Sequence, residues 1–417
     1  MSDRVAGGGR NAALHRWQAR LSRHVWPPPS VWSLAPLGSA IGVVAWWGPA
    51  WLIPLSFCLP FLFARVRSRR EIFALISGYA LGASWGLPIG AATYFGWRMG
   101  SALLIWGLGG CLQGVVFALA WSQTPMRKGM GVVIALSFLS LPPLGAIGWA
   151  SPLVSAGWLF PGWGTAGLGC TALLFVICLR KGRGEWFGGV GVIALWAAGF
   201  AVTPPAPVPG WTGIDLALPL TTQRASPSTD VDFARFLAMD SVAARAGLRP
   251  DEIVLLPESV FGPDDHADRL YWQALSDRVG VTVIGGGMWR RDGQRYNALW
   301  VMRPDRPARA AYAQRQPVPL SMWRPGSKDS WAAPWFGPSL AEIAGHRWGV
   351  LICYEQLLVW PAVASGMAGA EGFLLPSNLW WAGGTRIASQ LEGTSTAWAR
   401  LYGVPVVRAV NRGSLPP

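Results

Sequence analysis

Residues 350–355 read Val350-Leu351-Ile352-Cys353-Tyr354-Glu355, an apolar run that ends in a thiol, an aromatic ring and an acid. Such a short run of aliphatic and β-branched residues predicts a buried strand at 347–353, which places the thiol at the strand end. The other four cysteines lie in long apolar segments, where a thiol is usually a small hydrophobic group. A lone cysteine beside an acid at a strand end is a candidate nucleophile, and the competing interpretation is an ordinary core cysteine.

The composition divides the chain into an apolar half and a half typical of soluble proteins. Of the 417 residues, 52% are hydrophobic and only 13% are charged, whereas soluble domains carry about 25% charged residues. Between residues 32 and 203 the only acids are Glu71 and Glu185. The sequence therefore predicts a basic cytoplasmic segment at 1–31, a transmembrane helical domain at 32–203, a proline-rich linker at 204–212 and an extracytoplasmic domain at 213–417.

Seven apolar segments approach the length of about 20 residues that a spanning helix needs. They lie at 32–47, 49–64, 73–93, 100–121, 130–149, 162–179 and 187–203. Six spans is the alternative, because only Gly48-Pro49 separates the first two segments. With the N-terminus inside, fourteen basic residues fall in inside segments and one, Arg98, falls outside. This asymmetry predicts a bacterial inner-membrane protein with a periplasmic C-terminal domain.

The net charge of +14 does not indicate a nucleic-acid partner. The surplus lies in the short loops of the apolar half, while residues 204–417 carry 20 basic and 18 acidic residues. A patch that binds nucleic acid would concentrate the charge on a soluble domain. The apolar segments contain almost no charged residues, which disfavours a transporter as well.

Beyond residue 213 short strands and helices are predicted to alternate, which is typical of a layered α/β domain. Strands are predicted at 215–218, 252–257, 281–285, 297–302, 347–353, 372–376 and 404–410, and helices at 229–247, 270–279 and 387–401. The triplet Gly285-Gly286-Gly287 follows a predicted strand, and it lets a backbone pass close to the site.

A second strand end carries Glu258, directly after the run Leu255-Leu256-Pro257. A carboxylate and a thiol at strand ends can meet at one rim of a sheet, where Glu258 would take the proton of Cys353 and then activate an amine or water. Burial would raise the pKa of Glu258 and suit it to work as a base near neutral pH. A cation or an amide must then stabilise the oxyanion of the intermediate.

These segments resemble the nitrilase (carbon–nitrogen hydrolase) superfamily, and the whole chain resembles the apolipoprotein N-acyltransferases and the related TraB proteins of conjugative plasmids. The matching residues are Pro257-Glu258-Ser259, Tyr296-Asn297, Cys353-Tyr354-Glu355, and Ser377-Asn378 through Gln390 to Arg408, Asn411 and Gly413. The resemblance implies an αββα sandwich with a Glu–Lys–Cys triad. It implies that the cysteine takes an acyl chain from a membrane phospholipid as a thioester and passes it to a lipoprotein amine. Glu258 would be the base, Cys353 the nucleophile and Glu355 a supporting acid.

The chain departs from this family at several positions. Gln314 stands where the family has its lysine, Arg315 is next to it, and Lys328 is the only lysine after residue 203. Met322 replaces a lid glutamate of the family. The chain stops at Pro417, where the family continues with further strands and a helix, so a C-terminally shortened sheet with a bare edge is expected.

The remaining assignments each have two interpretations. Glu355 is either a supporting acid or a structural acid that accepts backbone hydrogen bonds. Asn378, Trp380 and Trp381 are expected to bind substrate, and core packing is the alternative role of the two tryptophans. No metal or cofactor is expected. The leading hypothesis is a cysteine-dependent N-acyltransferase or amidase with a lipoprotein or other protein amine as acceptor, and the alternative is a catalytically impaired scaffold within a conjugation or envelope machinery.

Overall fold

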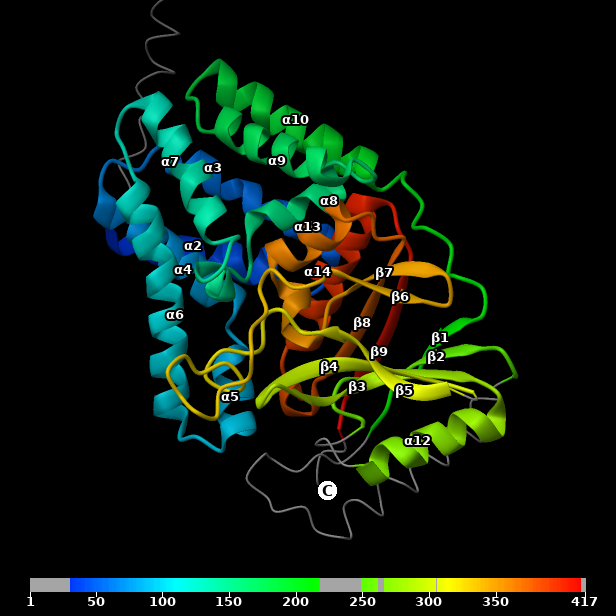
Figure 1. Cartoon of the computed structure of the whole chain (residues 1–417). Coiled ribbons are helices and arrows are strands. Elements are labelled where there is room, and N and C mark those ends of the chain that lie inside the picture. Colours follow the sequence, from blue (N-terminus) through cyan, green and yellow to red (C-terminus); the bar gives the residue numbers. More distant parts are fainter. Residues whose placement is uncertain (1–30, 218–248, 262–265, 305, 414–417) are drawn as a thin grey trace, which may run out of the picture.

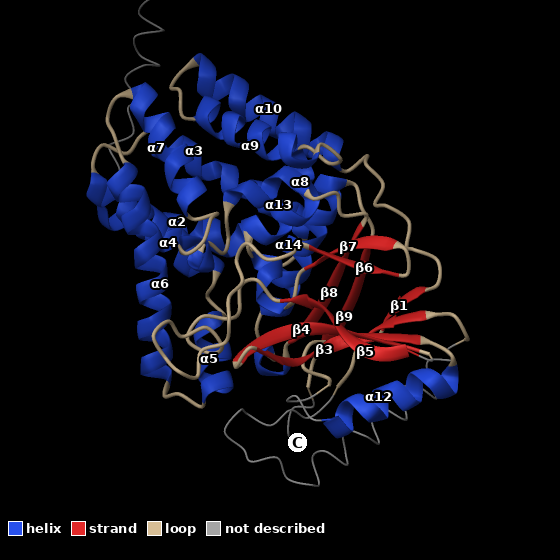
Figure 2. Ribbon diagram, in the orientation of Figure 1, coloured by secondary structure: helices blue, strands red, loops and turns tan. Residues whose placement is uncertain are grey.

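The structure is a computed structural model that describes residues 31–217, 249–261, 266–304 and 306–413. Figures 1 and 2 show two parts packed against each other, a helical region and a sandwich of two β-sheets. The predicted helix at 229–247 and residues 1–30 of the basic N-terminal segment lie outside the described residues.

Helices fill the region that the sequence assigns to the membrane. They are α2 (Val31–Ala45), η1 (Ala50–Phe57), α3 (Cys58–Phe63), α4 (Arg69–Ala83), α5 (Leu87–Phe95), α6 (Met99–Ala120), α7 (Pro125–Phe138), η2 (Leu144–Ile147), η3 (Pro152–Ser155), α8 (Ala156–Leu159), α9 (Gly164–Cys178) and α10 (Arg183–Gly199). Among the described residues only α6 is by itself long and apolar enough to cross a membrane, and at most three spans result if each of two bent helix pairs counts as one. Seven spans therefore remain a prediction. The segment predicted at 130–149 is not one helix, because α7 ends before Pro142-Pro143.

Glycines bring two of these helices into backbone contact. A Cβ atom on Gly38 or Gly42 of α2 would overlap carbonyl oxygens of α4, and one on Gly78 or Gly82 of α4 would overlap carbonyl oxygens of α2. Small residues at helix interfaces allow this close approach. The abundance of glycine in the apolar half is thus explained in part by helix packing.

The sandwich consists of a five-stranded and a four-stranded sheet. The first has the order β1 (Trp211–Gly213), β2 (Ile253–Leu255), β3 (Thr282–Arg291), β4 (Gln294–Arg303) and β5 (Arg306–Ala313), and the second has the order β6 (Leu340–Ile343), β7 (His346–Val350), β8 (Gly372–Asn378) and β9 (Val406–Asn411). Helix α12 (His266–Val279) covers the first sheet, and α13 (Val359–Met367) and α14 (Ile387–Tyr402) cover the second (Figure 2). The C-terminal part therefore has the predicted αββα arrangement.

The strand predictions needed several corrections. Strands β1, β5 and β6 and helix α13 were not predicted. Strands β1 and β6 are very short, and β5 contains two arginines that obscure its pattern. The strand predicted at 347–353 ends at Val350, and Cys353 begins a 3₁₀ turn, η4 (Cys353–Leu357). The strand predicted at 215–218 is reduced to a single bridge between Leu216 and Asn411.

That bridge lies at the edge of β9 that the sequence was expected to leave bare. The Leu216 amide donates to the carbonyl oxygen of Val410 at 2.9 Å, and the Arg412 amide donates to the carbonyl oxygen of Leu216 at 2.9 Å. The segment after β1 thus covers this edge at Leu216.

Helix α14 joins the sandwich to the helical region. Its Arg400, only 6% exposed, donates hydrogen bonds to the carbonyl oxygens of Gly199 (2.5 Å), Gly157 (3.2 Å) and Val202 (3.2 Å). At the other end of α14, Gln390 donates to the carbonyl oxygens of Trp46 (2.7 Å) and Ala83 (2.8 Å). These bonds satisfy carbonyl groups at helix ends, so they fix the sandwich against the helices.

We expect Arg400→Leu to lower the free energy of unfolding by about 2–3 kcal/mol, because buried carbonyl groups lose a charged donor. Thermal and denaturant unfolding in detergent micelles would measure the change. The matched control is Arg412→Leu, whose side chain is 58% exposed, and we expect a change within about 0.5 kcal/mol there. Equal effects of the two substitutions would contradict the role given to Arg400.

Candidate active site

Glu258 and Cys353 come together from the two sheets. Glu258 follows β2 of the first sheet and Cys353 follows β7 of the second, and their side chains are hydrogen-bonded to each other. Each residue is only 6% exposed. The carboxylate and the thiol therefore lie within hydrogen-bonding distance of each other, as their positions at strand ends predicted.

The backbone is strained at both positions. Cys353 has a φ of +47° and Ser259, next to Glu258, has a φ of +62°, which are left-handed values that residues other than glycine rarely adopt. Such strain is often found at functional sites. Behind Glu258 the chain passes close to Gly286 of β3, where a Cβ atom would lie 2.6 Å from the Cα of Glu258. The glycine triplet therefore has the role expected of it at this position.

Asn297 is a site residue to which the sequence analysis gave no role of its own. Its Nδ2 donates to Oε1 of Glu258 at 2.7 Å and to Oε1 of Gln314 at 2.8 Å, and the side chain is 2% exposed. The available signal was a polar residue at the start of the apolar run 297–302 of β4. Asn297 uses both hydrogens of its amide and so fixes the orientation of the carboxylate and of Gln314.

Gln314 lies between the acid and the turn that carries the nucleophile. It follows β5, is fully buried, and donates from Nε2 to the carbonyl oxygen of Ile352 at 2.9 Å. Its other Nε2 hydrogen is not used in this bond, since an amide nitrogen has two. Gln314 is therefore a neutral donor close to Cys353.

Arg315 is not part of the Glu258–Cys353 pocket. Its Nε donates to the hydroxyl of Tyr312 at 2.9 Å, and one terminal nitrogen donates to the carbonyl oxygen of Pro361 (2.9 Å) and to Oγ of Ser365 (3.0 Å). Lys328 is exposed in the loop between β5 and β6. Among the described residues, no lysine or arginine contributes to the pKa shift of Glu258 or of Cys353.

Glu355 has a structural environment. It is fully buried and accepts hydrogen bonds from the backbone amides of Arg315 (2.7 Å), Gln316 (3.2 Å) and Ile352 (2.9 Å) and from the hydroxyl of Tyr312 (3.1 Å). Burial raises the pKa of Glu355 to about 7, although Arg315 and the backbone amides oppose this change. These bonds tie the segment that carries Gln314 to the turn that carries Cys353, which favours the structural interpretation of Glu355.

The electrostatics of the pair keep the thiol protonated at rest. Burial, together with the charge of Glu258, raises the pKa of Cys353 well above its usual value, and the backbone amides of Asn378 and Tyr354 lower it. Burial also raises the pKa of Glu258, while hydrogen bonds from Cys353, Asn297 and the Asn378 amide lower it. The thiolate would therefore form only when the carboxylate takes up the proton.

The residues expected to bind substrate lie at different distances from the nucleophile. The backbone amide of Asn378 contacts both Glu258 and Cys353. Trp381 lines a cavity together with Cys353. Trp380 lies outside the lining of this cavity, where it packs against Tyr94 of α5 at 6.1 Å between ring centroids.

This cavity has a volume of about 240 Å³ and lies between the sandwich and the helical region. Its walls come from α4–α6, the loop after α7, residues 318–320, the nucleophile turn, η5 (Trp380–Ala382) and α14. The lining is almost entirely aliphatic or aromatic, and Tyr354 reaches across it to donate a hydrogen bond to the carbonyl oxygen of Ala146. The site can therefore hold an apolar chain next to a thiol and its base.

Within the described ranges, no cluster of three or more His, Cys, Asp or Glu side chains could hold a metal ion.

We expect Glu258→Gln to lower the pKa of Cys353, because the charge of Glu258 raises it. Alkylation of Cys353 by iodoacetamide should then begin at lower pH, because loss of the neighbouring negative charge favours the thiolate. Mass spectrometry of the Cys353 peptide would follow this reaction. Glu342→Gln, a change at an exposed residue of β6, is the control, and an alkylation profile that does not move in Glu258→Gln would contradict the coupling.

Comparisons with known proteins agree with this architecture. The carbon–nitrogen hydrolase family model matches residues 197–415. The conjugal transfer protein TraB of Agrobacterium fabrum is 34% identical over 418 residues, covering 96% of this chain and 98% of that protein. The probable conjugal transfer protein TraB of Sinorhizobium fredii is 32% identical over 381 residues, covering 89% of this chain and 95% of that protein.

Solved structures of this superfamily resemble part of the chain. A mutant of the Nesterenkonia AN1 amidase from the nitrilase superfamily has 18% identity and a TM-score of 0.31, covering 40% of this chain and 64% of the amidase. The carbon–nitrogen hydrolase from Helicobacter pylori has 16% identity and a TM-score of 0.29, covering 40% of this chain and 59% of that protein. On the family match and the two relatives, the chain belongs to the carbon–nitrogen hydrolase (nitrilase) superfamily, together with the TraB conjugal transfer proteins.

Proposed function

We propose that this chain is a membrane-bound, cysteine-dependent N-acyltransferase or amidase that acts through an acyl-thioester on Cys353. The observation that carries the proposal is that Cys353, which is hydrogen-bonded to Glu258, lines an apolar cavity of about 240 Å³. The cavity would hold the acyl chain of a membrane phospholipid, and the thiol would lie at its carbonyl end.

The first step would transfer the acyl group from oxygen to sulfur. Glu258 takes the proton of the Cys353 thiol, the sulfur attacks the ester carbonyl, and the proton passes to the leaving alcohol as the carbon–oxygen bond breaks. The backbone amide of Tyr354 and the second hydrogen on Nε2 of Gln314 would stabilise the oxyanion. In the second step, an amine or water attacks the thioester and the sulfur takes back a proton.

The membrane setting is part of the proposal. Leu104, Leu108 and Leu119 of α6 are 60–69% exposed, as an apolar surface in contact with lipid would require. The basic segments 64–68, 121–128 and 179–185, each a loop or a loop with the first turn of the next helix, gather at one end. There Arg65 pairs with Glu185 at 2.6 Å, and Gln123 donates to the carbonyl oxygen of Arg67 at 3.0 Å. This gathering supports an inner-membrane location with that end in the cytoplasm and the sandwich in the periplasm.

A second candidate function is a catalytically impaired scaffold that supports conjugal transfer. The specific observation is Gln314, a neutral residue where the resemblance expects a lysine, so the oxyanion would have amide donors alone. Both relatives are conjugal transfer proteins by name. A scaffold would act by binding other conjugation or envelope proteins, whereas an enzyme would act on a lipoprotein or another protein amine.

Capture of the thioester tests the leading proposal. Purified protein in detergent is incubated with phosphatidylethanolamine and digested, and the Cys353 peptide is weighed before and after treatment with neutral hydroxylamine, which cleaves thioesters. The proposal expects a mass increase of one acyl group on Cys353 that hydroxylamine removes. If the Cys353 peptide stays unmodified with both phosphatidylethanolamine and phosphatidylglycerol, the acyl-thioester proposal is contradicted and the scaffold function is favoured.

A further inference from the structure

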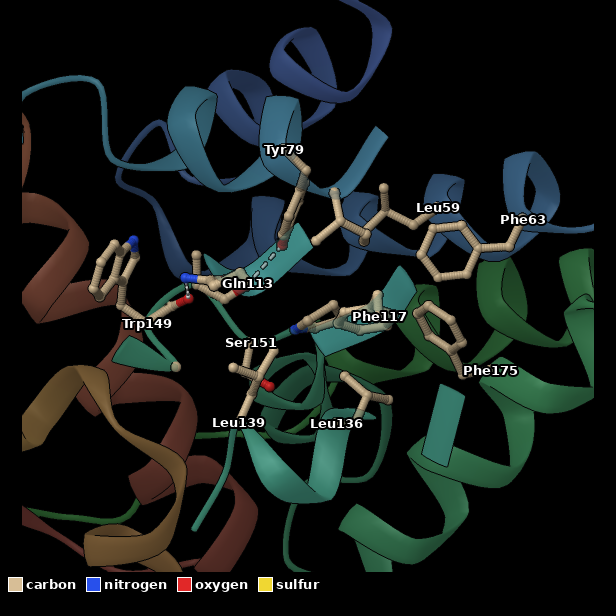
Figure 3. A pocket seen from close by; sticks show the side chains of 14 residues that line it. Leu59, Phe63, Tyr79, Gln113, Phe117, Leu136, Leu139, Trp149, Ser151 and Phe175 are labelled. Atoms are coloured by element: carbon tan, nitrogen blue, oxygen red, sulfur yellow. Dashed lines mark hydrogen bonds between the residues drawn. The ribbon is translucent and has the colours of Figure 1, made fainter. Parts of the chain in front are cut away.

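The helical region contains a second, smaller cavity, shown in Figure 3. Its volume is about 20 Å³, and most of its wall is aromatic or aliphatic, including Phe63, Phe117, Leu136 and Phe175. A cavity of this size holds little more than one water molecule. Its importance lies in its position relative to the larger cavity beside Cys353.

Helix α6 passes both cavities in succession. Ala102, Ile105 and Gly109 line the larger cavity, and Gln113 and Phe117, further along the helix, line the smaller one. Because these positions are three or four residues apart, they lie on one face of the helix. The two cavities therefore follow one another along the same face of α6.

Trp149 and Ala150 are the residues of the loop after α7 that line both cavities. A Cβ atom on Gly109 would lie 2.8 Å from the indole ring of Trp149, so the ring lies directly on the backbone of α6. The indole thus stands where the larger cavity ends and the smaller one begins.

Polar groups of the helical region hold this loop in place. Gln113 of α6 donates to the carbonyl oxygen of Ile147 at 2.7 Å, and Tyr79 of α4 donates to that of Ala150 at 2.9 Å. Figure 3 shows Tyr79 and Gln113 on the side of the smaller cavity that faces Trp149. Since carbonyl groups on both sides of Trp149 are bonded, the backbone that carries the indole is held in place.

We propose that Trp149 is a specificity-determining residue that sets the maximum length of the acyl chain attached to Cys353. The inference rests on the proposed acyl-thioester function. Each methylene that enters the larger cavity should strengthen binding about fourfold, until the terminal methyl group reaches the indole. A longer chain must then displace a ring that is packed on Gly109.

The experiment measures acylation of Cys353 by phosphatidylethanolamines that differ only in acyl-chain length, in steps of two carbons. In the unsubstituted protein we expect the rate to fall at least about tenfold within one or two steps beyond the longest chain that fits. Trp149→Ala joins the two cavities, and Trp149→Leu retains an apolar side chain in case the alanine variant does not fold. Both should move the length limit by two or more carbons toward longer chains.

The matched control is Trp106→Ala. Trp106 lines only the larger cavity, so its removal widens that space without opening the smaller one, and the length limit should not move. The Trp149→Leu variant must first show unchanged thermal unfolding and unchanged reactivity of Cys353 with iodoacetamide. If such a folded variant keeps the original length limit, the inference is overturned. Absence of acylation at every chain length in the unsubstituted protein would instead overturn the proposed function on which the inference rests.

Discussion

Replacing Cys353 with alanine is expected to abolish acyl-enzyme formation and, with it, the biological activity of the chain. Within the described residues, Cys353 is the one cysteine in the sandwich, because Cys58, Cys111, Cys170 and Cys178 lie in α3, α6 and α9. Only its sulfur is hydrogen-bonded to Glu258. No other described thiol can therefore replace it as the nucleophile.

The measurement combines two readouts. Labelling with a lipid-like thioester probe reports the chemistry, and transfer frequency between donor and recipient cells reports the role suggested by the relatives. The matched control is Cys58→Ser, which removes an exposed thiol and should leave both readouts unchanged. A scaffold predicts a different pair of results. Cys353→Ala would lose labelling yet keep a normal frequency of transfer between cells, and substitutions at exposed positions of the sandwich would lower that frequency.

The second large effect is expected from Gln314→Lys. A lysine at this position would place a cation near Glu258 and Cys353, and a nearby positive charge favours the ionised form of both groups. The pKa of each group should fall, so the thiolate should appear at lower pH. Since the pKa is logarithmic, a pKa of Cys353 that falls by about one should raise alkylation at neutral pH about tenfold. If the oxyanion lacks a strong donor at present, acyl transfer should rise by about 10²–10³-fold.

Iodoacetamide alkylation of Cys353 across a pH series measures the first effect, and the phosphatidylethanolamine reaction measures the second. Gln294→Lys makes the same chemical change at an exposed position of β4 and should leave the pH profile in place. An unchanged profile in Gln314→Lys would mean that the side chain at 314 does not act on the pair. A profile that moves to lower pH without faster acyl transfer would point to the scaffold.

Local patterns predicted much of this architecture. The apolar segments predicted helices, and the alternation of strands and helices predicted a layered α/β domain. The αββα sandwich was implied by the resemblance to the nitrilase superfamily. Glu258 and Cys353 could be paired because each follows an apolar run, and strands of a layered domain end at common rims. The short edge strands were missed, since β5 and β6 are too polar or too short to show a periodic pattern.

The sequence by itself determined the division into an apolar and an α/β part and the two reactive side chains at strand ends, because periodicity and composition are local properties. Only the tertiary structure decided that Asn297 holds the acid, that Arg315 turns away and that Glu355 is a structural acceptor. Their partners are up to 50 residues distant in the chain, and these long-range contacts in the folded core set their roles. The position of Trp149 in the cavity wall was likewise decided only by the tertiary structure, because this wall forms where α6, the loop after α7 and the sandwich meet.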